Sequence, residues 1–284
     1  MEIKTFNPKE MEVPALHHLL LGAVGPRPIC FASTVDEQGN RNLAPFSFFN
    51  VFSANPPIVV FSPAKSGKTG ADKHTYENAK ATKEVVINIV NYAMVNQMSL
   101  ASSPYPKGVD EFIKAGFTAI KSDIVKPDRV AESPVQMECK VNQIITLGDK
   151  GGAGNLIIAE VLKIHVAASI LLENNHIDQT KIDLVARMGD NFYCRAFGDA
   201  LFEISKPMTT LGIGVDALPT HIKETSSFSK NHLGMLGSAE NMPNQYALEQ
   251  IRLMNNSYEE RAAHALLLLA KNEYEQALEQ VWEK

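Results

Sequence analysis

The chain has 284 residues, of which 45% are hydrophobic and 21% are charged, with a formal net charge of −5. This composition is typical of a soluble globular protein with a sizeable core, and the length allows one large domain or one domain with an appendage. Because no basic excess is available to neutralise phosphates, we exclude a nucleic-acid-binding protein.

Two further classes are excluded by local patterns. The longest apolar run near the N-terminus, residues 19–24, is too short to span a membrane and lacks a signal-peptide layout. The three cysteines are widely separated and none lies in a CxxC pair, so we expect neither a disulfide framework nor a metal site. Cys30 and Cys139 lie in apolar runs and are interpreted as buried, inert thiols. A cytoplasmic location is the default expectation.

The N-terminal residues predict a short helix over 11–21, ending near Gly22 and Gly25. Arg27 follows between two prolines, which fix an extended backbone and limit the directions of its guanidinium group. It is equally consistent with a surface charge at a strand entrance and with a contact to an anion or cofactor.

Residues 26–63 predict three strands and two turns, with a tight hairpin turn over 36–40. Serine and asparagine side chains alternate with phenylalanines in the segment 46–50. By pattern alone, core strands with hydroxyl groups facing water are favoured. A flat, partly polar ligand such as a flavin would use the same mixture of apolar faces and hydrogen-bonding groups.

Residues 57–63 and 84–90 are rich in β-branched side chains and predict buried strands. The segment between them contains SGKTG, but a Walker loop would need glycine where Ser62 stands. The segment predicts a basic loop before a helix over 76–83. Lys73, His74 and Thr75 at the start of that helix form either a phosphate monoester site or a solvated loop.

The middle of the chain predicts a helix over 93–103, a short helix over 108–116, and long strands over 135–147 and 155–167. Asp110 and Glu111 would diverge on a helix, so we reject them as a general acid–base pair. The glycine-rich connection 148–154 lacks a following helix, which argues against a dinucleotide fingerprint.

Residues 186–195 predict a hairpin in which Arg187 and Arg195 flank Tyr193. Such a group could contact a nicotinamide nucleotide or a flavin, although a plain structural hairpin is slightly favoured.

The composition changes after Pro207, and residues 258–282 predict one strong amphipathic helix that packs on the domain or on a partner subunit. Six or more strands without regular βαβ alternation predict a mainly β protein, a β-barrel with helical additions. We therefore expect a domain over residues 1–205 and a helical C-terminal extension over 206–284.

Several of these motifs, in this order, resemble the flavin reductase-like proteins, which are FMN-binding split barrels. They are PRPI at 26–29, ST at 33–34, NLAPFSFFN at 42–50, PPIVVFS at 56–62, KHTYEN at 73–78, GVDEF at 108–112 and RMG at 187–189. The resemblance covers roughly residues 14–200. It implies a six-stranded Greek-key barrel, a homodimer, and FMN held near the dimer interface.

The resemblance also implies which residues contact the cofactor. Ser33 and Thr34 would lie beside the flavin, and Lys73 and Thr75 would contact its phosphate, with Ser62 close by. His74 replaces an aspartate common in relatives. Arg27 and Arg187 are further candidates. The isoalloxazine and ribityl path would be lined by Asn42, Ala44, Pro45, Ser47, Phe48 and Asn50.

The favoured hypothesis is an NAD(P)H-dependent flavin reductase that transfers hydride from nicotinamide to FMN. No catalytic side chain is expected, because the cofactor carries the chemistry. The alternative is a flavoredoxin-like FMN-binding electron carrier reduced by a redox protein partner, without turnover of NAD(P)H. A third hypothesis is a non-enzymatic oligomeric scaffold with a vestigial pocket. The expected partners are flavin, nicotinamide and a second copy of the chain, with no nucleic acid and no membrane.

Overall fold

The computed structural model describes residues 2–204 and 210–284. The chain divides into two compact units, Met1–Leu201 and Phe202–Lys284, each described by itself. The domain boundary that we predict between residues 205 and 206 lies outside the described residues. In the described ranges, no helix combines the length and the apolar character that crossing a membrane requires.

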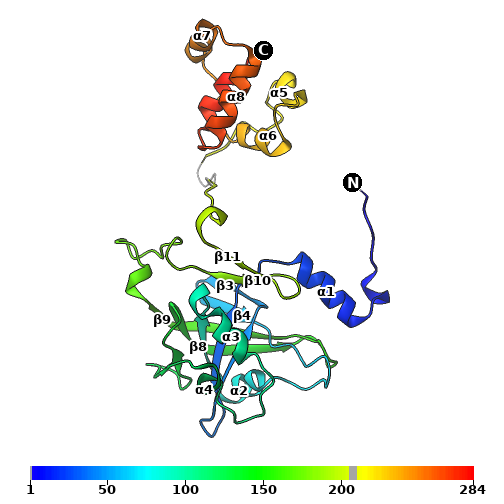
Figure 1. Ribbon diagram of the computed structural model, residues 1–284, viewed down its shortest axis with the longest axis vertical. Coiled ribbons are helices and arrows are strands. Elements are labelled where there is room, and N and C mark those ends of the chain that lie inside the picture. The colour runs from blue at the N-terminus through cyan, green and yellow to red at the C-terminus, as the bar shows by residue number, and fades with distance from the viewer. Residues whose placement is uncertain (1, 205–209) are drawn as a thin grey trace. The chain divides into compact units, whose positions relative to one another are not determined.

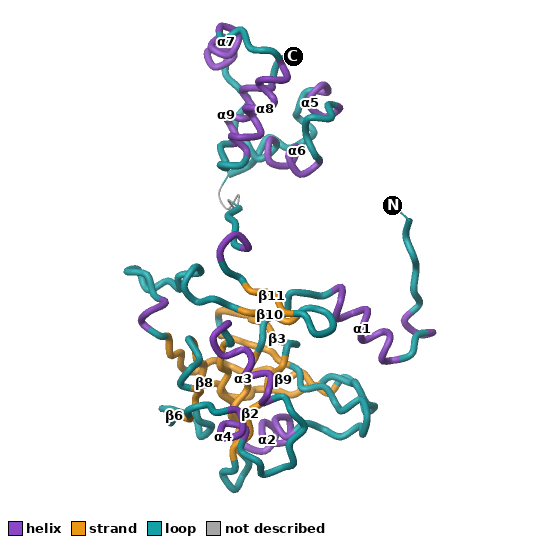
Figure 2. Tube along the Cα trace, in the orientation of Figure 1, coloured by secondary structure: helices purple, strands orange, loops and turns teal. Residues whose placement is uncertain are grey.

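The first unit is built on one antiparallel sheet of seven strands (Figures 1 and 2). Its order is β2-β1-β5-β8-β9-β4-β3, so β2 and β3 are the two edge strands. Two small two-stranded sheets, β6–β7 and β10–β11, accompany it. The strands are β1 Cys30–Val35, β2 Arg41–Phe46, β3 Phe49–Ala54, β4 Pro57–Phe61, β5 Glu84–Ile89, β6 Ala119–Ile120, β7 Arg129–Val130, β8 Val135–Thr146, β9 Asn155–Val166, β10 Val185–Arg187 and β11 Tyr193–Arg195.

Residues 26–63 contain four strands, so the prediction of three is wrong, and the sheet has seven strands where six were expected. The chain leaves β2 after Phe46 and begins β3 at Phe49. β2 pairs with β1, whereas β3 pairs with β4 at the other end of the strand order. Phenylalanines recur on both sides of this boundary and no glycine or proline marks it, so periodicity could not reveal where one strand ends and the next begins.

This connection closes the sheet. Two residues, Ser47 and Phe48, join the two edge strands, and such a link spans at most about 10 Å. The edges can lie that close only if the sheet curls on itself. A further hydrogen bond fastens the join, from the Ser62 amide after β4 to the Phe48 carbonyl, at 2.9 Å. The result is the predicted barrel.

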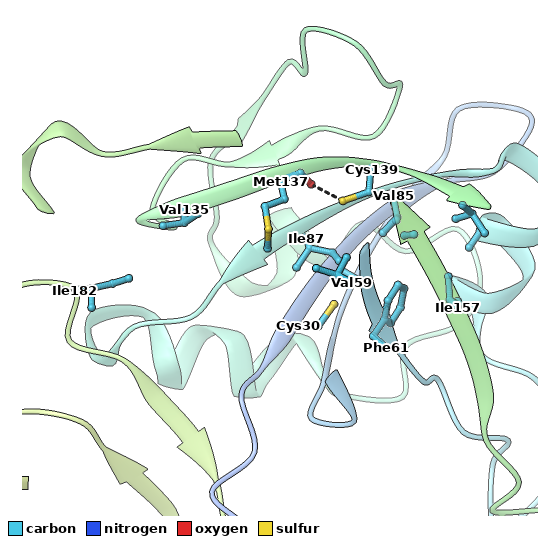
Figure 3. Packing of buried hydrophobic residues seen from close by; sticks show 14 of the residues in the cluster. Cys30, Val59, Phe61, Val85, Ile87, Val135, Met137, Cys139, Ile157 and Ile182 are labelled. Carbon is cyan, nitrogen blue, oxygen red and sulfur yellow. Dashed lines mark hydrogen bonds between the residues drawn. The ribbon is translucent and has the colours of Figure 1, made fainter. Parts of the chain in front are cut away.

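The barrel interior is filled by side chains from β1, β4, β5, β8 and β9 (Figure 3). Phe61, Cys139 and Ile157 are fully buried there, with Cys30 and Ile87. Both cysteines are unpaired, and burial raises the pKa of the Cys139 thiol to about 12. The Cys139 thiol instead contacts the Met137 carbonyl at 3.4 Å. These cysteines are inert core residues, as the sequence predicted.

The helices of the first unit are α1 Val13–Ala23, α2 His74–Thr82, α3 Val95–Ala101 and α4 Glu111–Ala115, with 3₁₀ turns at Pro8–Glu10, Tyr92–Met94, Ala168–Ile170 and Gly198–Ala200. Helices α2, α3 and α4 pack against the sheet, whereas no residue of α1 is buried. The short helix α4 lies within the predicted range 108–116 and is capped at both ends. The Asp110 carboxylate accepts a hydrogen bond from the Phe112 amide at 2.9 Å, and Gly116 ends the helix at φ 73°.

The second unit contains α5 Thr220–Glu224, α6 Lys230–Leu236, α7 Gln245–Leu253, α8 Tyr258–Leu269 and α9 Tyr274–Val281. The prediction of a single helix over 258–282 is wrong. Asn272 has φ 60°, a left-handed conformation that asparagine tolerates, and it reverses the chain between α8 and α9. The apolar stripe continues through both helices because both face one core, which includes Ala265, Leu269 and Leu278.

A buried carboxylate fastens the loop before β7 to the sheet. Glu138 on β8 is fully buried and accepts hydrogen bonds from the amides of Asp123, Ile124 and Val125 at 2.9, 2.7 and 3.2 Å. It also contacts Nε2 of His165 at 2.7 Å. Although burial acts to raise the pKa of Glu138, these donors outweigh it and lower the pKa below its ordinary value.

We expect Glu138→Ala to lower the free energy of unfolding at pH 7 by about 2–4 kcal/mol, since it removes a charged acceptor from several buried donors. Because the pKa is lowered in the folded state, this stabilisation exists above the unfolded pKa and is lost as pH falls through the folded pKa. Urea denaturation at several pH values should therefore show a deficit that shrinks in acid. Glu173→Ala, at an exposed position, is the control and should change stability by less than about 0.5 kcal/mol. A pH-independent deficit would contradict the assignment.

Candidate functional site

A cavity of about 540 Å³ lies beside the end of β2, where the barrel closes. Its walls come from the β2–β3 connection, the loop between β4 and α2, the start of α2 and residues 101–105. Most of the predicted cofactor-contact residues line it: Arg27, Asn42, Ala44, Pro45, Ser47, Phe48, Ser62, Lys73, His74, Thr75 and Arg187.

Three predicted residues do not line this cavity. Ser33 is buried in β1, opposite Leu43, and its hydroxyl has no partner among the described residues. Thr34 is also buried in β1. Asn50 is exposed on β3, and its side-chain carbonyl accepts a hydrogen bond from the amide of Val51 at 2.8 Å. Alternation along a strand sends neighbouring side chains to opposite faces, and a motif match alone does not settle which face a residue takes.

Thr34 supports the site indirectly, through hydrogen bonds with residues that position the start of α2. Asn42 donates from its side-chain nitrogen to the hydroxyl groups of Thr34, at 3.2 Å, and Thr75, at 2.9 Å. Asn78 also donates to Thr34 at 3.2 Å. All four side chains are buried, so this network fixes the start of α2 against β1 and β2.

The start of α2 provides a positive end to the cavity. The helix begins at His74, two residues earlier than predicted, so His74 and Thr75 lie in its first turn and Lys73 is its N-cap. Amide groups in a first turn lack partners within the helix and carry partial positive charge. Together with the Lys73 ammonium group they favour an anion.

The loop before α2 is held by the glycine-rich connection 148–154, a role that the sequence did not suggest. The Lys65 amide donates to the Ala153 carbonyl at 2.9 Å, and the Gly152 amide donates to the Lys65 carbonyl at 3.1 Å. The Lys65 ammonium group pairs with Asp72 at 2.8 Å, so the carboxylate next to Lys73 is already neutralised. Asn155 donates to the same carboxylate at 3.3 Å.

Arg27 is not a surface charge, because its exposed fraction is 6%. Its guanidinium group donates to the carbonyls of Leu21, Val24 and Met188, with 2.7 Å to Leu21 and to Met188. It thereby ties the end of α1 to the residues after β10. Burial lowers the pKa of Arg27, and the neighbouring charge of Arg187 lowers it further.

Several lining residues were missed by sequence reasoning. They include His17, the segment Ser102–Tyr105 and Glu111. Glu111 is buried, and burial raises the pKa of its carboxyl group, which accepts a hydrogen bond from the Leu43 amide at 2.9 Å. Its contact is with a strand far away in the chain, so no local spacing could have revealed it. For the segment Ser102–Tyr105, the sequence Ser-Pro-Tyr-Pro at 103–106 is a signal that could have marked a loop near the site.

The cavity suits a long ligand with a ring at one end and an anion at the other. Pro45, Phe46 and Phe48 provide apolar surface, with the Ser47 hydroxyl among them, and the α2 end provides positive charge. Its volume lies in the range of about 300–1,000 Å³ typical of small-molecule sites. The residues present therefore fit FMN, whose isoalloxazine ring and phosphate lie at opposite ends.

The model of the flavin reductase like domain matches residues 23–181, more than half of the chain. The chain belongs to this family. The fold is accordingly the split barrel of flavin reductase-like proteins, and the family resemblance deduced from the sequence motifs is confirmed.

Individual relatives agree with this assignment. A protein of Aquifex aeolicus is 36% identical over 196 residues, which cover 69% of this chain and 97% of the relative. Nitrilotriacetate monooxygenase component B from Bacillus cereus superposes with a TM-score of 0.67 at 29% identity, covering 72% of this chain and 100% of that one. A split barrel domain protein from Shewanella frigidimarina gives 0.61 at 26% identity, covering 72% and 99%.

We expect Gly151→Ala to loosen the flavin reductase-like domain's loop 64–73. The added methyl group would lie 2.9 Å from the Ser66 carbonyl oxygen, which belongs to the backbone and cannot rotate away. Limited trypsin digestion should therefore cut faster after Lys65 or Lys68 than in the wild type. Gly67→Ala, in the same loop with no atom within 4 Å, should digest like the wild type. Equal rates for both variants would contradict the bracing role of residue 151.

Proposed function

We propose that this protein binds FMN in the cavity beside β2 and reduces it with NAD(P)H. The supporting observation is that one cavity has two chemically different ends. Apolar and hydroxyl groups lie at the β2–β3 connection, and positive charge lies at the start of α2. Membership of the flavin reductase-like family makes a flavin the ligand class to expect.

In this proposal Lys73, Thr75 and the first amides of α2 hold the phosphate. Ser47 and the backbone of the β2–β3 connection give hydrogen bonds to the edge of the isoalloxazine ring, and Phe46 and Phe48 cover apolar surface. Ser62 and His74 also line the cavity.

Bound FMN would supply the redox chemistry, accepting hydride from a nicotinamide. The chain has to orient two rings and exclude water. Asp110 caps α4 and Glu111 holds the Leu43 amide, so both carboxylates have structural partners. The proposal therefore assigns no general acid or base.

We also propose a homodimer, because apolar surface of the first unit is left uncovered in one chain. No residue of α1 is buried, although its sequence, VPALHHLLLGA, is mostly apolar. Edge strand β3 exposes 64% of Val51 and 67% of Phe52. Open strand edges with exposed apolar side chains are surfaces that a second copy can cover.

Lys73→Ala should raise the dissociation constant for FMN about tenfold or more, since a charge-assisted hydrogen bond contributes about 1.5–3 kcal/mol. Quenching of flavin fluorescence on titration with the protein measures this constant. Lys80→Ala removes the same charge from the exposed end of α2 and should bind FMN like the wild type. An unchanged constant in Lys73→Ala would remove Lys73 from the site.

Rapid mixing of the FMN-loaded protein with NADH or NADPH should bleach flavin absorbance at a rate that saturates with nicotinamide concentration. Saturation is expected because two rings must stack in one site before hydride moves. Slow reduction that never saturates, with FMN still tightly bound, would instead support the electron-carrier alternative.

Val51→Glu/Phe52→Glu should convert a particle of twice the 31.2 kDa chain mass into one of a single chain mass in sedimentation velocity. Charges facing each other across an apolar interface disfavour association. A control double substitution on the exposed positions Lys121 and Lys126 should leave the mass unchanged. A monomeric wild type would overturn the dimer proposal.

A further inference from the structure

A second cavity of about 480 Å³ adjoins the first. The two share Pro45, Phe46, Ser47, Ser102 and Arg187 in their walls, so they lie side by side at these residues. The shared residues lie at the β2–β3 connection, which is the end assigned to the isoalloxazine ring. A molecule in the second cavity would therefore reach the ring end of the site, away from the start of α2.

The walls of the second cavity contain several polar groups, and among the described residues their only charge is positive. Arg187 is the one charged side chain among the described residues that line it. Ser99 on α3 and Asn191 in the β10–β11 turn add a hydroxyl and an amide, and Tyr193 adds an aromatic ring. These groups come from parts of the chain that are far apart in sequence.

The guanidinium group of Arg187 is positioned but not neutralised. It lies 4.6 Å from the centre of the Tyr193 ring and makes a long hydrogen bond, 3.4 Å, to the Phe192 carbonyl. No ion pair of the described residues includes Arg187. The carboxylate of Asp190, in the same turn, pairs with His18 instead, at 3.1 Å.

A second guanidinium group reinforces this positive charge. Arg27 and Arg187 exchange two backbone hydrogen bonds of 2.9 Å, which fix the two residues side by side. Arg27 gives its side-chain hydrogen bonds to neutral carbonyls, so its charge too lacks a carboxylate partner. Two adjacent cations in a partly buried wall create a positive potential that an anion would relieve.

We propose that the second cavity binds a phosphate group of the nicotinamide dinucleotide through Arg187. This inference rests on the proposed function, and it adds the place where the electron donor is held. The FMN phosphate is assigned to the opposite end of the first cavity, so an anion beside the ring end has to belong to another molecule. Planar guanidinium groups bind phosphate oxygens through two parallel hydrogen bonds, and a Tyr193-stacked guanidinium is already oriented for that.

Two variants test the site from different sides. Arg187→Met removes the charge and retains much of the side-chain bulk, with Arg187→Lys as the conservative partner. Ser99→Phe fills the second cavity at a position that does not line the first. Arg195→Met is the matched control, since Arg195 lies in the same hairpin, stacks on aromatic rings and pairs with Asp183, but lines neither cavity.

The readout is calorimetric binding of oxidised NADP⁺, which cannot reduce the flavin, to the FMN-loaded protein. Arg187→Met and Ser99→Phe should each weaken NADP⁺ about tenfold or more, and Arg187→Lys less. Nicotinamide riboside, which lacks phosphate, should bind Arg187→Met and wild type equally. Arg195→Met should match the wild type. The dissociation constant for FMN, measured separately by fluorescence, should change less than about threefold in Ser99→Phe and Arg195→Met, which do not touch the first cavity. In Arg187→Met, where the side chain lines both cavities, the loss of FMN affinity should be clearly smaller than the loss of NADP⁺ affinity.

Three results would overturn the inference. They are undetectable binding of NADP⁺ to the wild type, unchanged NADP⁺ affinity in Arg187→Met, and equal losses of FMN and NADP⁺ in that variant. Failure of the proposed function is seen separately, as absence of FMN binding in the fluorescence titration. In that case the flavin-free protein is titrated with NADP⁺. An Arg187-dependent signal would then sustain the phosphate site, and its absence would overturn it.

Discussion

The two-residue connection between β2 and β3 is the constraint on which the rest of the first unit depends. It joins the two edges of a seven-stranded sheet, so the sheet has to curl until those edges lie together. Curling brings the end of β2 close to the loop before α2, although about 25 residues separate them in the chain. The cavity lies at this join, and the end that we propose for the isoalloxazine ring is made by the connecting residues themselves.

Electrostatic polarity follows from how the neighbouring elements are fastened. The α2 end is positive because a helix starts there and because Lys65 already neutralises Asp72. The opposite end is positive because neither arginine there is neutralised by a carboxylate. Arg27 donates its hydrogen bonds to backbone carbonyls, and Arg187 stacks on Tyr193. In our proposal the phosphates of FMN and of the nicotinamide dinucleotide take these two positive ends, and the two rings meet between them.

Prediction succeeded where the deciding interaction is local. The short helix α4, found within the predicted range 108–116, is such a case, because Asp110 and Gly116 cap it within one turn of helix. The long strands β8 and β9 are another, since their β-branched residues recur over many positions. Prediction failed where one sequence pattern is compatible with two different structures. The phenylalanine-rich segment 46–52 contains a strand boundary that no turn residue marks, and the apolar stripe over 258–282 continues through the reversal at Asn272.

The sequence alone determined the family, the β-rich class, and most of the residues that come together around the cavity, because these depend on motif order and local pattern. The tertiary structure decided which face each residue takes and what else the site contains. Ser33 is buried in β1 and Asn50 is exposed on β3, so neither lines the cavity, whereas Glu111 lines it through a contact with a distant strand. Gly151, also distant in the chain, packs against the loop before α2. The second cavity beside Arg187 is of the same kind, since no single segment of the chain contains it.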